Sequence, residues 1–178
     1  MPSIIITGGP GSGKSTLLDA LQEQGFNTVP EVSRGLIREQ VALQSTCLPW
    51  LDLNAFAALC LDRMEADFRS ADANAITFFD RGIPDIVAYL RVGGLESSPV
   101  LSAAVGQWRY APTVFVAPPW EAIYINDDER WQTFEESAVL YEAVCQVYQE
   151  AGYHVVTLPF GTVEERVRFV LKMLINEF

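Results

Sequence analysis

The sequence predicts an α/β protein built on a parallel sheet that helices cover on both faces. Short apolar runs, typical of strands buried on both faces, alternate along the chain with segments of helical periodicity. Polar residues directly follow several of these runs, and in parallel sheets the carboxyl ends of the strands meet at the edge where ligands bind. A chain of 178 residues has the length of a single domain, which we expect to span residues 1–178.

Capping and turn residues define the boundaries of the expected elements. Gly25 ends the first helix, Asp52 is a suitable N-cap for the longest one, and Pro84 suits a first helical turn. In chain order, we expect a strand over residues 3–7, a helix over 14–24, a strand over 27–29, helices over 33–43 and about 52–70, a strand over 75–79, helices over 84–92 and 98–108, a strand over 113–116, a helix that ends near 152, a strand over 155–157 and a helix over about 163–176.

Composition and charge narrow the classes of partner. Twelve basic and 23 acidic residues give a net charge of −11, so we expect binding neither to nucleic acid nor to an anionic membrane surface. No apolar run approaches the ~18–20 residues of a membrane helix, and a strand over 3–7 leaves no room for a signal peptide. Three widely spaced cysteines match neither a disulfide framework nor a zinc site. We therefore expect a cytoplasmic protein with a small-molecule partner, and a homodimer stays open.

The strongest motif follows the first strand and indicates a phosphate-binding loop. It fits G-x-x-x-x-G-K-[ST] without a substitution, whereas a glycine-rich turn with no ligand would rarely match by chance. Glycines let backbone N–H groups point at phosphate oxygens, and the following helix adds its positive end. Lys14 would contact the β- and γ-phosphates, Ser15 would ligate Mg²⁺, and Thr16 would face the α-phosphate. The predicted nucleotide-binding residues are Gly8, Gly9, Pro10, Gly11, Ser12, Gly13, Lys14, Ser15 and Thr16.

A second group of candidates follows the third strand. Asp80 ends this apolar run and is predicted to hold Mg²⁺, directly or through water, although it could instead only open a turn. Arg81 is a candidate for bidentate phosphate binding, and the alternative is an ion pair with Asp80 or Asp85. Asp85 is a candidate substrate residue, with the alternative that it is only a favourable charge in the first turn of a helix.

The remaining candidates follow the second and fourth strands. Glu31 is predicted to take a proton from a substrate hydroxyl as general base, with Arg34 as a further substrate residue; the alternative is a salt bridge between them. We expect a lid over about 120–137, whose Arg130 would contact the transferring phosphate. The alternative is a solvated acidic face in which Asp127 or Asp128 caps the next helix.

These motifs resemble the "AAA domain" family of small bacterial phosphate-loop ATPases or kinases, which is similar to the ribosylnicotinamide kinase domain of the NAD-biosynthesis regulator. The resemblance covers nearly the whole chain. It implies a P-loop NTPase three-layer sandwich with a five-stranded parallel sheet in the order 2-3-1-4-5, as in nucleoside and nucleotide kinases. It also implies ATP and Mg²⁺ as cofactors. The segments that carry it are residues 8–15, 30–34, 79–85 with 88–89, 118–120 with 123–124, 128–130 with 132, 152–153 and 158–159.

Three functions are compatible with these residues. The first is a kinase that transfers the γ-phosphate of ATP to a hydroxyl group, with Lys14, Glu31, Asp80, Arg81 and Arg130 as catalytic residues. The second is an ATPase or nucleotide-dependent switch that acts through a protein partner, and the third is a nucleotide-binding fold without activity. A lid and a candidate base favour the kinase. The single lid arginine departs from the nucleoside monophosphate kinases and favours a neutral, nucleoside-like acceptor.

Overall fold

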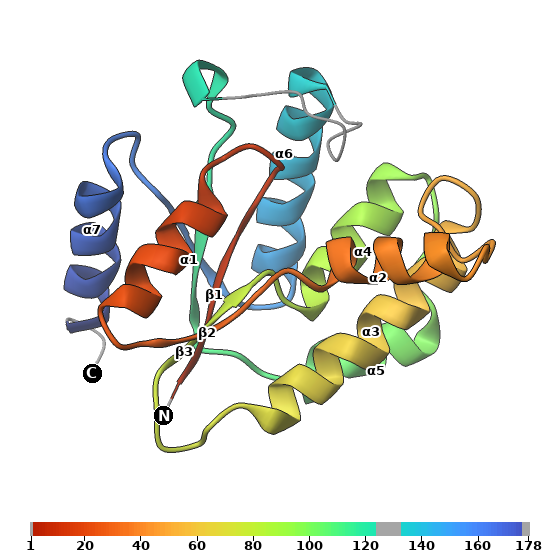
Figure 1. The fold of residues 1–178 in the computed structure, drawn as a ribbon, viewed down its shortest axis with the longest axis horizontal. Coiled ribbons are helices and arrows are strands. Elements are labelled where there is room, and N and C mark those ends of the chain that lie inside the picture. The colour runs from red at the N-terminus through yellow and green to blue at the C-terminus, as the bar shows by residue number, and fades with distance from the viewer. Residues whose placement is uncertain (1, 124–132, 176–178) are drawn as a thin grey trace.

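The structure, a computed structural model, describes residues 2–123 and 133–175, in which strands and helices alternate as predicted (Figure 1). Observed and predicted boundaries differ by a residue or two. The elements are β1 (Ser3–Gly8), α1 (Lys14–Glu23), β2 (Asn27–Val29), α2 (Val32–Ala42), α3 (Leu53–Ser70), β3 (Thr77–Asp80), α4 (Ile83–Val92), α5 (Pro99–Gln107), β4 (Thr113–Ala117), the 3₁₀ helix η1 (Glu121–Ile123), α6 (Phe134–Glu150), β5 (His154–Thr157) and α7 (Val163–Ile175).

The five strands form one parallel sheet in the order β2-β3-β1-β4-β5, which confirms the predicted order. The register decides which residues meet at its carboxyl edge. Ile6 of β1 lies opposite Asp80 of β3, and Gly8 lies opposite Ala117 of β4. The glycine-rich loop after β1 therefore begins directly beside the end of β3.

Alternate side chains of the central strands enter two different cores. Ile4, Ile6 and Phe78 pack against α1 and α7 on one face of the sheet. Ile5 and Phe79 point the other way and pack against α4 and α6. Because both faces are covered, the middle residues of the central strands are apolar on both sides, which explains the short continuous apolar runs in the sequence. The three layers are visible in Figure 1.

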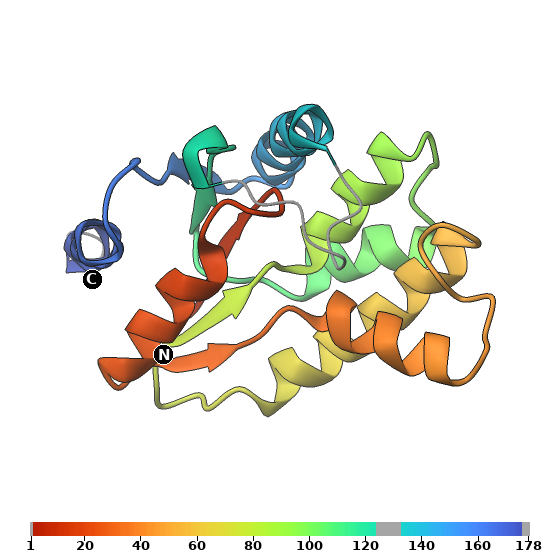
Figure 2. The ribbon, with the colours of Figure 1, turned by 45° about the horizontal axis from the view of Figure 1, so that its top comes forward.

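Helices α2, α3 and α5 gather around α4 and form a third core beyond the sheet (Figure 2). Phe56 of α3, Leu90 of α4 and Leu101 of α5 are buried there. This group of helices extends from the carboxyl ends of β2 and β3, so it forms one wall beside the phosphate loop.

Local signals explain the helix ends. The Asp52 side chain accepts a hydrogen bond from the Ala55 backbone N–H at 2.9 Å, which confirms the expected cap of α3. Helix α6 begins at Phe134, and Thr133 and Glu136 form a reciprocal capping box at its start. A cap at Asp127 or Asp128, the alternative considered for this helix, would require an earlier start. Asp127 and Asp128 lie outside the described residues. None of the helices in the described segments is long and apolar enough to cross a membrane.

Candidate active site

The backbone of the phosphate loop, which connects β1 to α1, has a positive φ at Gly8, Gly11 and Gly13, a conformation that glycine adopts readily. Gly8 has a φ of +133°, and a Cβ there would lie 2.3 Å from the carbonyl oxygen of Ala117. Gly13 has a φ of +78° and forms the N-terminal boundary of α1. Left-handed angles and close contact with β4 therefore account for the glycines that the motif requires.

Lys14 lies buried in the first turn of α1 and reaches back across the loop. Its Nζ donates to the carbonyl oxygen of Gly9 at 2.8 Å. Burial and the neighbouring Arg81 guanidinium lower the pKa of Lys14 to about 8, although three nearby carboxylates act in the opposite direction. Ser15 and Thr16 are exposed at the start of the same helix. The first turn of α1 thus carries one buried ammonium group and two exposed hydroxyl groups.

Asp80 ends β3 and is 5% exposed. Its Oδ1 has no hydrogen-bond partner among the described residues, and burial raises the pKa of this carboxyl group while Lys14 opposes the shift. Within those residues, no three metal-binding side chains cluster. Mg²⁺ usually binds through one or two protein oxygens together with phosphates and water. An Asp80 oxygen without a partner, on the strand beside the one that leads into the phosphate loop, therefore fits Mg²⁺ better than an all-protein metal site.

Arg81 turns back under the phosphate loop because its backbone adopts a φ of +74°. Its guanidinium donates to the carbonyl oxygen of Gly8 at 2.9 Å. The Nε lies 3.1 Å from Glu31 Oε1, without the alignment of a hydrogen bond, and Nη1 lies 3.6 Å from Asp85 Oδ1. Of the two interpretations of Arg81, the ion pair is thus present, with Glu31 as a partner that the sequence did not indicate. Phosphate binding by Arg81 stays a prediction.

Glu31 precedes α2 and lies between two guanidinium groups. It accepts a hydrogen bond from Ser33, and Arg34 lies 3.7 Å away as an ion pair. Burial would raise the pKa of Glu31, but Arg81, then Lys14 and Ser33, hold it well below its usual value. The salt-bridge alternative is therefore present for Glu31, and its role as a base stays a prediction.

Asp85 lies in the first turn of α4 and is 1% exposed. It accepts hydrogen bonds from the hydroxyl groups of Thr7 and Tyr148 and from the backbone N–H of Gly82 at 2.9 Å. This network ties β1, α4 and α6 together at the floor of the site. Nothing in the sequence pointed to Thr7 or Tyr148, because both lie far from Asp85 in the chain. The predicted role of Asp85 toward a substrate is not tested by these contacts.

Arg166 is a residue of the site that the sequence analysis did not identify. It belongs to α7 and is 2% exposed. Its guanidinium donates to the carbonyl oxygens of Ser12 at 2.8 Å and Pro159 at 3.0 Å. It thus attaches α7 and the loop after β5 to the phosphate loop. The sequence of α7 has the pattern of an ordinary surface helix, so the role of Arg166 could be found only from its tertiary contacts.

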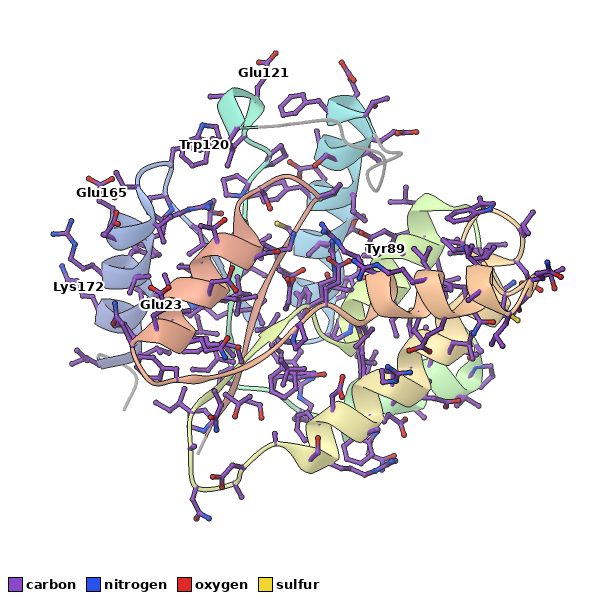
Figure 3. The ribbon with its side chains drawn as sticks, in the orientation of Figure 1. Glu23, Tyr89, Trp120, Glu121, Glu165 and Lys172 are labelled. Carbon is purple, nitrogen blue, oxygen red and sulfur yellow. The ribbon has the colours of Figure 1, made fainter. Side chains whose placement is uncertain are left out.

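A cavity of about 510 Å³ opens beside the phosphate loop, between α2, α3 and α4, and the start of α6 also lines it. Pro10, Glu31, Arg34, Arg81 and Asp85 line it together with apolar side chains of the three helices. Tyr89 of α4 also lines it and lies near the start of α2 (Figure 3). The Arg81 guanidinium stacks over the Tyr89 ring at 5.3 Å. The cavity has the size of a small-molecule site.

Part of the expected lid, including Arg130, lies outside the described residues. The segment before it is described. Trp120 precedes η1 and lies above the phosphate-loop edge of the sheet (Figure 3). Its ring packs against Phe160 at 5.3 Å and under the Arg166 guanidinium at 5.4 Å. This packing brings the start of the lid segment next to the loop after β5.

The sheet order, the phosphate loop and the carboxylate at the end of β3 define a P-loop protein with the fold of the small kinases. Solved structures agree on the fold. A deoxyadenosine kinase from M. mycoides is 13% identical with a TM-score of 0.71, over 99% of this chain and 100% of that one. A thymidylate kinase from Ehrlichia chaffeensis is 18% identical with a TM-score of 0.63, over 98% and 99%.

The protein NadR, solved in complex with NR, is 18% identical with a TM-score of 0.68 and aligns with 97% of this chain and 50% of its own length. The model of an AAA domain family matches residues 3–166, so the chain belongs to this family. That result confirms the resemblance inferred from the motifs. A comparison with curated proteins finds no match.

Proposed function

We propose that the protein is a Mg²⁺-dependent kinase that transfers the γ-phosphate of ATP to a hydroxyl group of a small, neutral, nucleoside-like acceptor. One observation carries this proposal: a cavity of small-molecule size adjoins the phosphate loop, with Glu31 and Arg81 among the residues that line it. A protein that only hydrolyses ATP, or that acts as a nucleotide-dependent switch, has no need of a second small-molecule site there.

The loop residues would bind the nucleotide. Backbone N–H groups of residues 8–13 and the start of α1 suit phosphate oxygens, and the Lys14 ammonium group, held at the loop by the Gly9 carbonyl oxygen, adds a positive charge. Ser15 and Asp80 would hold Mg²⁺, which neutralises charge on the phosphates when it is bound. Phosphate near Lys14 favours its protonated form, so the lowered pKa of Lys14 is compatible with tight binding.

Glu31 would orient the acceptor hydroxyl group by accepting its hydrogen bond. A carboxylate with a pKa well below its usual value is a weak base, so it takes up the proton late, as the bond to phosphorus forms. Phosphoryl transfer depends more on positioning and charge than on base strength, which makes this arrangement sufficient. Arg81 fixes the position of Glu31, and Arg130 would contact the transferring oxygens.

The charges around the cavity favour a neutral acceptor. Four carboxylates and two guanidinium groups line it, so an acceptor that already carries phosphate would be repelled. We also propose a cytoplasmic location, with which the free thiols of Cys47, Cys60 and Cys145 agree. A homodimer stays a prediction.

The decisive experiment measures ADP release with and without nucleosides as acceptors. We expect Glu31→Gln and Arg130→Ala each to leave the ATP affinity within about tenfold, ~1.4 kcal/mol, while acceptor-dependent release falls by at least about 100-fold.

Asp80→Asn should fold like the parent and lose turnover. Glu39→Gln, an exposed carboxylate on α2, is the matched control and should keep full activity. Slow hydrolysis that no acceptor stimulates and that Glu31→Gln barely changes would instead indicate a nucleotide-dependent switch.

A further inference from the structure

The cavity beside the phosphate loop is polar at one end and apolar along the rest of its wall. Glu31, Arg34, Arg81 and Asp85 belong to the first turns after β2 and β3, at the carboxyl edge of the sheet. The other acidic residues that line it, Glu135 and Glu136, are exposed on α6. Two hydroxyl-bearing residues of the lining, Ser33 and Tyr89, contact Glu31 and Arg81 of the polar end. The rest of the wall consists mainly of apolar side chains from α2, α3 and α4, chiefly Ile37, Phe56, Ala57, Met64, Ile86 and Leu90.

The backbone of this wall is equally poor in free hydrogen-bonding groups. Apart from Leu53 in the first turn, the α3 residues that face the cavity lie inside a helix whose N–H and C=O groups bond to one another. At the end of α4, the carbonyl groups of Tyr89, Leu90 and Arg91 already accept hydrogen bonds from residues 93–95. The only polar side chain of the α3 wall is Cys60, and burial, together with Glu31, raises the pKa of its thiol to about 12. A thiol is a weak hydrogen-bond donor.

We propose that the acceptor places its hydroxyl group near Glu31 and an aromatic or apolar body, without hydrogen-bonding groups on its far edge, against α3. This inference rests on the proposed kinase function and names its acceptor class more closely. A polar group at the far edge would leave water without finding a partner on the described wall, which costs about tenfold to a hundredfold in affinity. The wall therefore selects against a base that carries polar groups on that edge.

Two ribosides test this inference, because they share the sugar hydroxyl groups and a two-ring body. Inosine carries a carbonyl oxygen and an N–H on the base edge, and benzimidazole riboside carries neither. We expect benzimidazole riboside to exceed inosine at least tenfold in kcat/KM for ADP release. The same preference should appear in the Kd of each riboside, measured by calorimetry without ATP.

Met64→Gln places an amide of nearly the same length on the α3 wall, and we expect it to reduce the preference at least fivefold. The control is Val41→Gln on α2, which is 54% exposed and lies outside the cavity, and which should keep the parental preference. Melting curves establish that each variant folds. Should Met64→Gln fail to fold, Ile37→Gln offers the same test from the part of the lining that belongs to α2.

The outcomes separate this inference from the proposed function. Equal or better use of inosine by the parent would overturn the apolar-body inference, while transfer to either riboside would leave the kinase standing. Binding with the expected preference but no acceptor-dependent ADP release would overturn the kinase and support the inference. If neither riboside binds, both are wrong.

Discussion

Glu31 and Arg81 form a buried ion pair whose contribution to stability depends on pH. The folded protein holds the pKa of Glu31 well below its usual value of 4.5, because the attraction of Arg81 and Lys14 outweighs burial. A lowered carboxyl pKa adds stability that is complete above pH 4.5 and is lost as the pH falls toward the folded-state pKa. Removal of the carboxylate also leaves Arg81 buried with one partner fewer.

We expect Glu31→Gln to show a smaller loss of stability in acid than the parent. Between pH 5 and pH 3, the free energy of unfolding of the parent should fall by about 1–2 kcal/mol more than that of the variant. Urea unfolding at the two pH values measures the difference. Glu39→Gln, which removes an exposed ion pair between α2 and Arg63 of α3, should follow the parent. Parallel curves for Glu31→Gln and the parent would contradict the ion pair as described.

At the scale of single residues, the sequence predicted which residues belong to the site better than it predicted the contacts between them. Gly8, Lys14 and Asp80 were found because each residue type has a chemical reason at a fixed place after a strand. The pairing of Arg81 with Glu31 was missed, since it depends on how β2 and β3 lie side by side. Arg166 was missed for the same reason, because its contact with Ser12 joins residues 154 positions apart.

A buried hydroxyl group of α6 contacts the carboxylate of Asp85. Tyr148 is fully buried and donates to Asp85, which also accepts from Thr7 and Gly82. A second tyrosine on the same helix, Tyr141, makes an exposed hydroxyl contact with Thr157 at 3.1 Å. The two tyrosines therefore offer a comparison within one element between a buried and an exposed hydrogen bond.

We expect Tyr148→Phe to lower the free energy of unfolding by about 1–3 kcal/mol, because the buried Asp85 carboxylate loses a partner. Tyr141→Phe should change it by less than about 0.5 kcal/mol. Chemical denaturation of both variants at neutral pH provides the measurement. Equal effects would show that Asp85 is satisfied without Tyr148.

The boundaries of the elements were predictable where local chemistry defines them. Asp52 before α3 and Pro84 in α4 are local signals, and both were interpreted correctly. The start of β3 was predicted at residue 75, whereas the strand begins at Thr77, because Ala75 donates to Asp72 in a preceding turn. The cavity could not be predicted at all, since α2, α3 and α4 form it together.

On the scale of the whole molecule, the phosphate loop joins both layers of helices to the sheet. Arg166 connects it to α7, and the Ser137 hydroxyl on α6 donates to the carbonyl oxygen of Pro10 at 3.3 Å. A ligand bound in the loop should therefore stabilise the entire domain rather than one segment. The sheet order itself came from the resemblance, because periodicity identifies strands but does not order them.

ATP with Mg²⁺ at about 100 times its Kd should stabilise the parent by about 2.7 kcal/mol, which raises Tm by roughly 5–10 °C. Lys14→Ala should remove most of this shift, because it weakens binding by ~1.5–3 kcal/mol. The control is Lys172→Ala, since the chain contains only these two lysines and Lys172 lies exposed on α7 (Figure 3). Scanning calorimetry measures the shifts. A full shift in Lys14→Ala would contradict nucleotide binding by the loop.

The parallel sheet also separates the described chain ends from the site. Strand β1 starts at Ser3 on the amino edge, and α7 runs back to end at Ile175 near the same edge (Figure 1). The phosphate loop and the cavity lie at the opposite, carboxyl edge. A tether attached at either end would hold the molecule on a sensor surface with its ligand-binding edge turned toward the solution. Immobilisation would thus leave the phosphate loop and the cavity accessible from the solution.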